Sequence, residues 1–155
     1  MTDTLIIERA ELLSIIPHGG KMALLDRITD YDLEKRILTA EYEIGPECLF
    51  YDPEQKNIPS WVSFEFMAQS VSALAGLYNR KAGRKPRPGF ILSVSNLNIT
   101  APALEPGLIR IHIREDCRMD DILNYQGEVF RKDELLAAAK LTVMETDDFS
   151  LLEAR

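Results

Sequence analysis

The chain has 155 residues, of which 46% are hydrophobic and 28% are charged, and its formal net charge is −7 at pH 7. This composition is typical of a globular protein, and the length is enough for one hydrophobic core, so a single domain over 1–155 is expected. The acidic balance argues against nucleic acid or an anionic membrane surface as a partner, and no apolar run approaches the roughly 20 residues of a membrane-spanning helix.

The N-terminal part of the chain predicts a short helix, a loop and a hairpin. The helix is expected over 5–13, and the loop over 17–20, where a proline and two glycines interrupt periodic structure. Two strands are expected over 22–31 and 35–44, because apolar and polar residues alternate in the second of them. A short polar connection between these strands makes the pair a hairpin.

The remainder of the chain predicts one long helix followed by strands. An irregular connection over 45–58 leads to a helix at about 60–79 that has apolar residues around most of its circumference and is therefore expected to be buried. The order of elements indicates an α+β fold in which an antiparallel sheet of about six strands wraps around this helix. The four strands expected after the helix are 90–99, 108–114, 124–131 and 135–145.

The cysteines and the N-terminus bear on the cellular compartment. Cys48 and Cys117 stand far apart without metal-ligand spacing, which is typical of reduced, mostly buried thiols in a cytoplasmic protein. The N-terminus lacks a basic segment followed by an apolar stretch, so no secretory leader is expected. No zinc-binding, nucleophile-elbow or phosphate-loop motif occurs, and neither a metal nor another cofactor is expected.

Glu65 is the strongest candidate for a catalytic residue. It lies in the apolar stretch of the long helix, where desolvation would favour the protonated carboxyl that a general acid requires. Gln69, Ser72 and Gly76 follow it on the same helical stripe, with Ala68 beside them. This small and polar stripe predicts a cleft or a close contact. The alternative is a structural carboxylate, satisfied by a backbone amide or a basic side chain at a subunit interface.

His18 is the second candidate, because glycines follow it and an imidazole exchanges protons at cellular pH. The alternative is a loop histidine that only fixes the entry to the first strand. His112 alternates with arginines on a wet strand face and is expected at the surface. The segment 80–87 holds five basic residues, which either form a solvated helix end or bind an acidic partner.

Two motifs resemble a known family. Residues 16–27, Ile-Pro-His-Gly-Gly-Lys-Met-Ala-Leu-Leu-Asp-Arg, and residues 64–69, Phe-Glu-Phe-Met-Ala-Gln, resemble the opening and the glutamate helix of bacterial 3-hydroxyacyl-acyl-carrier-protein dehydratases. The Trp-x-x-x-Glu start of the helix is similar to the aryl-polyene biosynthesis branch. The resemblance implies the hot-dog fold, a dimer with active sites at the subunit interface, and Glu65 as the acid. It also implies the dehydration of 3-hydroxyacyl thioesters to trans-2-enoyl thioesters in fatty-acid or polyene biosynthesis.

The sequence departs from this family at the catalytic histidine. Typical members of the fatty-acid branch carry it in a Gly-His-Phe-Pro loop before the helix, and the corresponding residues 49–54 contain no histidine. Three possibilities follow. His18 serves as the base, which is the favoured one; Tyr51 or Asp52 replaces it; or the chain is a degenerate partner of an active dehydratase.

The resemblance also implies roles for further residues. The amides of Val62 and Ser63 would hold the thioester oxygen, Gln69 would orient Glu65, and aromatic and small residues would line the acyl tunnel. The partners implied are an acyl carrier protein and a second hot-dog chain, identical or related. The remaining expected site residues are Trp61 and Tyr51 for substrate binding and Arg84, Lys85 and Arg87 for docking the carrier protein. The enzymatic alternative is a hot-dog thioesterase, in which the helix carboxylate would activate water or attack the thioester.

Overall fold

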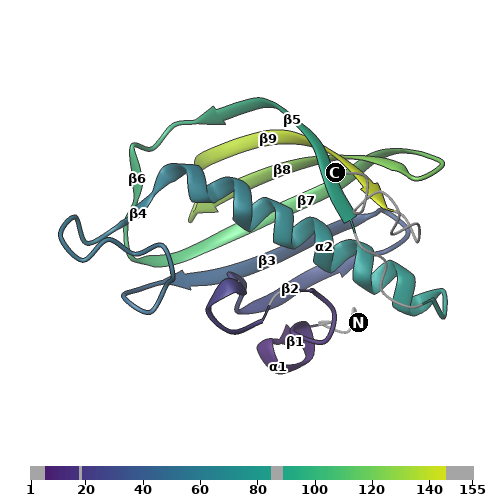
Figure 1. Cartoon of the computed structure of the whole chain (residues 1–155), viewed down its shortest axis with the longest axis horizontal. Coiled ribbons are helices and arrows are strands. Elements are labelled where there is room, and N and C mark those ends of the chain that lie inside the picture. The colour runs from purple at the N-terminus through teal and green to yellow at the C-terminus, as the bar shows by residue number, and fades with distance from the viewer. Residues whose placement is uncertain (1–5, 18, 85–88, 146–155) are drawn as a thin grey trace, which may run out of the picture.

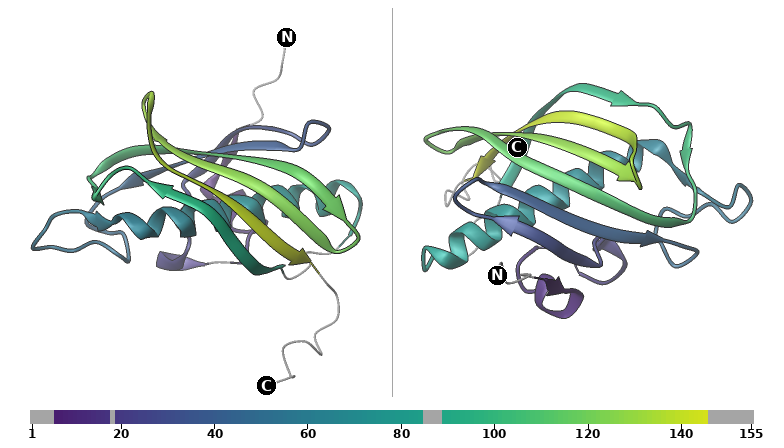
Figure 2. Two further views of the ribbon diagram at one scale, coloured as in Figure 1. Left: turned by 90° about the horizontal axis from the view of Figure 1, so that it is seen from above. Right: turned by 180° about the vertical axis from the view of Figure 1, so that it is seen from behind.

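The structure, a computed structural model, describes residues 6–17, 19–84 and 89–145. Within them, seven strands form one antiparallel sheet, and the long helix α2 (Ser63–Lys81) lies across one face of it (Figure 1). Figure 2 shows the sheet curving around this helix. The strands before α2 are β1 (Ile7–Glu8), β2 (Arg27–Asp32), β3 (Ile37–Ile44) and β4 (Ile58–Pro59). Those after it are β5 (Gly89–Ile99), β6 (Ala103–Leu104), β7 (Gly107–Met119), β8 (Ile122–Arg131) and β9 (Glu134–Glu145).

The sheet order is β1-β2-β3-β7-β8-β9-β5, and β4 and β6 pair separately beside the start of α2. The register of β3 and β7 places Leu38 opposite Ile113 and Ala40 opposite Ile111, and all four side chains are fully buried. Because successive side chains of a strand point to opposite faces, this register turns one apolar face of the sheet toward α2 and leaves the polar face outside.

Close contact between α2 and the sheet forms the centre of the core. Phe66 and Met67 are fully buried, and the Phe66 ring lies 5.4 Å from the Tyr42 ring on β3. On β8, Gly127 faces Met67 so closely that a Cβ atom there would lie 2.7 Å from the Met67 sulfur. Glycine at this position therefore lets the helix and the sheet approach each other.

The C-terminal end of α2 is closed by a Schellman motif. Gly83 has a φ of 71°, the left-handed conformation that glycine adopts without a steric penalty. The Arg84 N–H donates to the Asn79 carbonyl at 2.8 Å, and the Gly83 N–H donates to the Arg80 carbonyl at 3.2 Å. These bonds satisfy carbonyls that the helix itself leaves open.

The predicted architecture is confirmed. One long helix is packed against an antiparallel sheet, which is the hot-dog arrangement, and the hairpin and the four later strands are present. The predicted helix over 5–13 is wrong in extent, since it consists of β1 and the single-turn α1 (Arg9–Leu12). The first hairpin strand begins at Arg27 and not at residue 22. The two-residue strands β1, β4 and β6 are too short to produce a periodic pattern in the sequence.

The prediction for the cysteines is only half right. Both are free; Cys48 is buried but Cys117 is exposed. A register shift between Glu115 and Cys117 interrupts the pairing of β7 with β8, and such a bulge changes the direction of the side chains that follow it. Among the described residues, no helix combines the length and hydropathy needed to span a membrane.

Candidate active site

Glu65 lies in the first turn of α2 and is held there by Gln69. The Gln69 Nε2 atom donates to Glu65 Oε1 at 2.9 Å, which is the contact expected from their spacing of one helical turn. Glu65 is half-buried rather than buried, because the stripe on which it lies faces a cavity and not the sheet. Its carboxyl is therefore both positioned by the protein and open to a ligand.

Gln69 also forms hydrogen bonds with the chain segment that follows residue 18. Its Nε2 atom donates to the Met22 carbonyl at 2.7 Å, and its Oε1 atom accepts from the Leu24 N–H at 2.7 Å. Gln69 is fully buried, so its three hydrogen bonds satisfy an amide that would otherwise be costly to bury. A single side chain thus connects Glu65 to the loop that contains the second candidate residue.

The segment before residue 18 also packs against α2. A Cβ atom at Gly76 would lie 2.7 Å from the Ile15 carbonyl oxygen, so glycine at this position lets the loop lie directly on the helix. Ile16 and Pro17 continue along the same cavity. His18 itself lies outside the described residues, and its role as the base stays a prediction.

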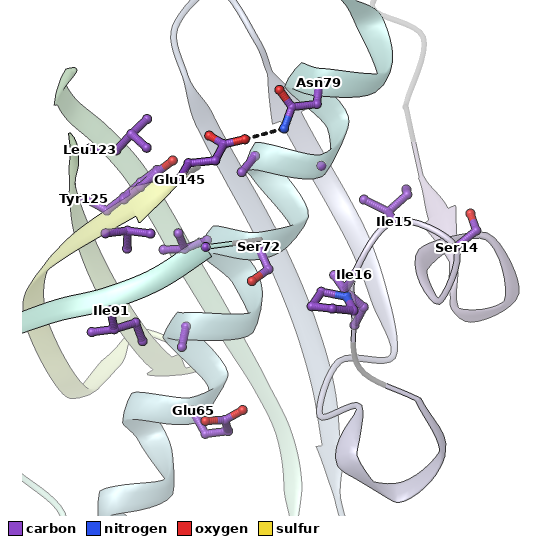
Figure 3. A pocket seen from close by; sticks show the side chains of 17 residues that line it. Ser14, Ile15, Ile16, Glu65, Ser72, Asn79, Ile91, Leu123, Tyr125 and Glu145 are labelled. Atoms are coloured by element: carbon purple, nitrogen blue, oxygen red, sulfur yellow. Dashed lines mark hydrogen bonds between the residues drawn. The ribbon is translucent and has the colours of Figure 1, made fainter. Parts of the chain in front are cut away.

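A cavity of about 560 Å³ runs along α2 from Glu65 (Figure 3). The helix contributes small side chains to it, among them Ala68, Ser72 and Gly76. The small and polar stripe was predicted to line a cleft or a close contact, and it does both, since the stripe lines this cavity and Gly76 contacts Ile15. Ile15 and Ile16 lie on one side of the cavity and Ile91 of β5 on the other (Figure 3), so its walls are mostly apolar and suit an acyl chain.

The far end of the cavity is polar. Asn79 donates a hydrogen bond from Nδ2 to Glu145 Oε1, and both residues are 3% exposed (Figure 3). Arg118 lies 4.0 Å from the other carboxylate oxygen of Glu145. Burial, followed by the negative charges of Glu115 and Glu145, raises the pKa of Tyr125 above its ordinary value, which keeps its hydroxyl protonated.

The other residues predicted to bind substrate do not line this cavity. Trp61 is 54% exposed, with its ring 5.5 Å from the Phe50 ring. Val62 and Ser63 are fully buried, and the Ser63 N–H already donates to the Ser60 carbonyl in a 3-10 turn (Ser60–Val62). One of the two amides nominated for the thioester oxygen therefore has a partner within the chain, and these binding roles stay predictions.

The alternative bases lie in the connection before α2. Asp52 accepts hydrogen bonds at Oδ1 from the backbone N–H groups of Glu54 and Gln55, at 2.9 and 3.2 Å. Such an Asx turn gives this carboxylate a local structural role. Tyr51 is half-buried. Neither residue lines the cavity at Glu65.

The second histidine and the predicted docking residues lie away from Glu65. His112 is on the outer face of the sheet, where its Nδ1 atom is 3.0 Å from the Thr39 hydroxyl. Arg84 is exposed just beyond the end of α2, with its guanidinium 5.8 Å from the centre of the Tyr78 ring. Lys85 and Arg87 lie outside the described residues.

Sequence reasoning missed the polar far end of the cavity. Asn79 follows Ser72 and Gly76 at helical spacing, so extending the stripe by one turn would have included it. Glu145 and Tyr125 come from β9 and β8, and only the pairing of the sheet brings them to the end of α2.

Comparison with known proteins gives consistent matches. The family model of the ApeP-like proteins, described as ApeP dehydratase, matches residues 10–153. The 3-hydroxyacyl-[acyl-carrier-protein] dehydratase FabZ of Chlamydia caviae is 32% identical over 131 residues, which cover 83% of this chain and 75% of the relative. FabZ of Rickettsia akari is 26% identical over 92% of this chain and 99% of its own length.

A solved structure has the same fold. A chain of the dehydratase heterocomplex ApeI:P from Xenorhabdus doucetiae superposes with a TM-score of 0.83 at 16% sequence identity. The match covers 92% of this chain and 95% of that one.

Proposed function

Because this chain belongs to the ApeP-like dehydratase family, we propose that it catalyses 3-hydroxyacyl-[acyl-carrier-protein] dehydration, with Glu65 as its general acid and His18 as its general base. The observation that carries these roles is the bridge made by Gln69. It holds the Glu65 carboxyl at one end of a cavity and the loop after residue 18 beside it.

The proposed reaction needs two proton transfers at neighbouring carbon atoms. The base removes a proton from C2 of the acyl chain, and the electron pair forms the C2–C3 double bond. The C3–O bond breaks, and the acid protonates the departing hydroxyl, which leaves as water. A carboxyl can serve as the acid and an imidazole as the base, and Gln69 links the helix that carries Glu65 to the segment that follows His18. The thioester bond stays intact, which separates this reaction from that of a thioesterase.

The test of this function uses purified protein and a 3-hydroxyacyl thioester on its carrier protein. Formation of the enoyl thioester is followed by absorbance, and released thiol is recorded in the same sample. We expect enoyl formation without thiol release. Thiol release with no enoyl product would instead favour the thioesterase.

His18→Ala is expected to lower the dehydration rate by about 10²- to 10⁴-fold, the usual range for loss of a general base. His112→Ala is the matched control, because the second histidine lies on the outer face of the sheet. Retained turnover in His18→Ala would exclude His18 as the base and direct the search to Tyr51, Asp52 or the partner chain.

The proposed partner is a related hot-dog chain that pairs with the β5 edge of the sheet. β5 is the last strand in the sheet order, and Ile91, Leu92 and Leu97 on it are exposed. An open edge with apolar side chains is a template for pairing with another strand. The similar chain from Xenorhabdus doucetiae belongs to a dehydratase heterocomplex, which supports a heterodimer here. Turnover that appears only after mixing with such a chain would identify this protein as the partner subunit.

The carrier protein is proposed to dock on Arg84, Lys85 and Arg87, which stand out on a chain of net charge −7. Reversing these three charges is expected to raise KM for carrier-bound substrate about tenfold, because long-range attraction to an acidic partner is lost. KM for a short pantetheine thioester should not change. Equal effects on both substrates would contradict the docking role.

We place the reaction in the cytoplasm, where free cysteines such as Cys48 and Cys117 persist.

A further inference from the structure

The cavity beside α2 changes character along its length. At one end it has Glu65, in the middle it has the small side chains of Ser72 and Ala75, and at the other end it has Asn79 and Glu145 (Figure 3). Glu65 and Asn79 are fourteen residues apart on one helix, which corresponds to about 21 Å at 1.5 Å per residue. The polar pair thus lies far from the catalytic carboxyl but in the same cavity.

The polar end is a built feature of the fold. Asn79 and Glu145 come from α2 and β9, are both almost fully buried, and are joined by a hydrogen bond. Arg118 lies 4.0 Å from Glu145, and its Nε–H donates a hydrogen bond to Glu115 Oε1 at 3.2 Å. If the apolar end of an acyl chain contacted the Glu145 carboxylate and the Asn79 amide, these groups would lie against an apolar surface. Such a contact is unfavourable because it leaves polar groups in less polar surroundings.

Resting on the dehydratase function proposed above, we propose that Asn79 and Glu145 form the distal end of the acyl-chain site and set the longest apolar acyl chain accepted. Chains that end among Ser72, Ala75 and Ile91 contact only small or apolar side chains. A longer chain brings its terminal methyl group against the Asn79–Glu145 pair. Selectivity between chain lengths therefore resides at the end of the cavity farthest from the chemistry.

Two substitutions with opposite effects test this proposal. Asn79→Ala shortens the side chain at the far end and removes its amide, so the ratio of kcat/KM for long over short acyl chains should rise about tenfold, the scale on which pockets discriminate single methylenes. Ala75→Leu fills the cavity before its far end, so the same ratio should fall by a similar factor. The substrates are a series of unbranched 3-hydroxyacyl thioesters on one carrier protein.

The control is Asn124→Ala. The Asn124 Oδ1 atom accepts a hydrogen bond from the Thr142 hydroxyl at 2.8 Å, and the residue does not line the cavity. Loss of this bond should leave the chain-length ratio unchanged. Circular dichroism and thermal unfolding show which variants fold, and Ala75→Leu carries the test by itself if Asn79→Ala does not fold.

The outcomes separate this proposal from the proposed function. If the wild type turns over substrate but neither folded variant changes the chain-length ratio, the proposed limit at Asn79 and Glu145 is overturned. The dehydratase function would then stay in place. No turnover by the wild type on any chain length, alone or with a related hot-dog chain, would overturn both. A long-over-short ratio that rises in Asn79→Ala and falls in Ala75→Leu supports the proposal that the far end of the cavity limits the chain length.

Discussion

Glu65→Gln is expected to lower the rate of dehydration by about 10²- to 10⁴-fold, the contribution that a positioned general acid typically makes. The amide has nearly the shape of the carboxyl but has no acidic proton to give to the departing hydroxyl. Its oxygen can still accept the hydrogen bond that Gln69 Nε2 donates to Glu65 Oε1 at 2.9 Å in the wild type. The loss should therefore arise from the chemistry and not from disruption of α2, and it is measured as the initial rate of enoyl formation.

The matched control is Glu128→Gln, which makes the same change at a half-buried carboxylate opposite His112 on β7. This residue does not line the cavity, so turnover should stay at the wild-type level. Thermal unfolding of both variants should resemble that of the wild type. If Glu65→Gln kept its turnover, the carboxyl would be structural, and the acid would have to come from another residue or from the partner chain.

The largest loss of stability is expected from Phe66→Ala. Phe66 is fully buried between α2 and the sheet, with its ring 5.4 Å from that of Tyr42. Truncation removes most of the side chain from a close-packed core and leaves a cavity, which typically costs about 3–5 kcal/mol. Unfolding in urea should accordingly shift to a lower midpoint with little change in slope.

Phe64→Ala is the control for this prediction, because it removes the same atoms two residues away at a half-buried position. Its loss of unfolding free energy should be clearly smaller. Both variants are compared at one protein concentration, since association with a partner adds to apparent stability. Equal losses at the two positions would show that Phe66 does not lie at the centre of the core.

The sequence was informative wherever a periodic pattern extended over several turns or residue pairs. The alternation in β3 and β7 and the proline-free apolar helix α2 predicted the elements and their order, because the side chains of long elements must match a buried face. Two-residue strands leave no such pattern. Cys117 was misjudged because a bulge in the pairing of β7 with β8 is invisible in the residue types around it.

In the candidate site too, the local spacing was predictable from the sequence and the long-range contacts were not. Spacing along one helix was enough to place Glu65, Ser72 and Gly76 on a common stripe that faces a cleft, since helical geometry is local. The contacts of Gln69 with Met22 and Leu24 join residues more than forty positions apart. The packing of Ile15 on Gly76 spans an even larger separation. These contacts depend on how the N-terminal segment folds back over α2, and residue order does not specify that path.

The sequence by itself therefore determined the class of fold and the reaction, and it singled out Glu65 as the candidate acid, because these depend on long periodic elements and on two short motifs. Only the tertiary structure decided that Gln69 links Glu65 to the loop after residue 18 and that Asn79 meets Glu145 at the end of the cavity. The physical reason is that pairing of β9 within the sheet and close packing on α2 bring together groups that no local pattern relates.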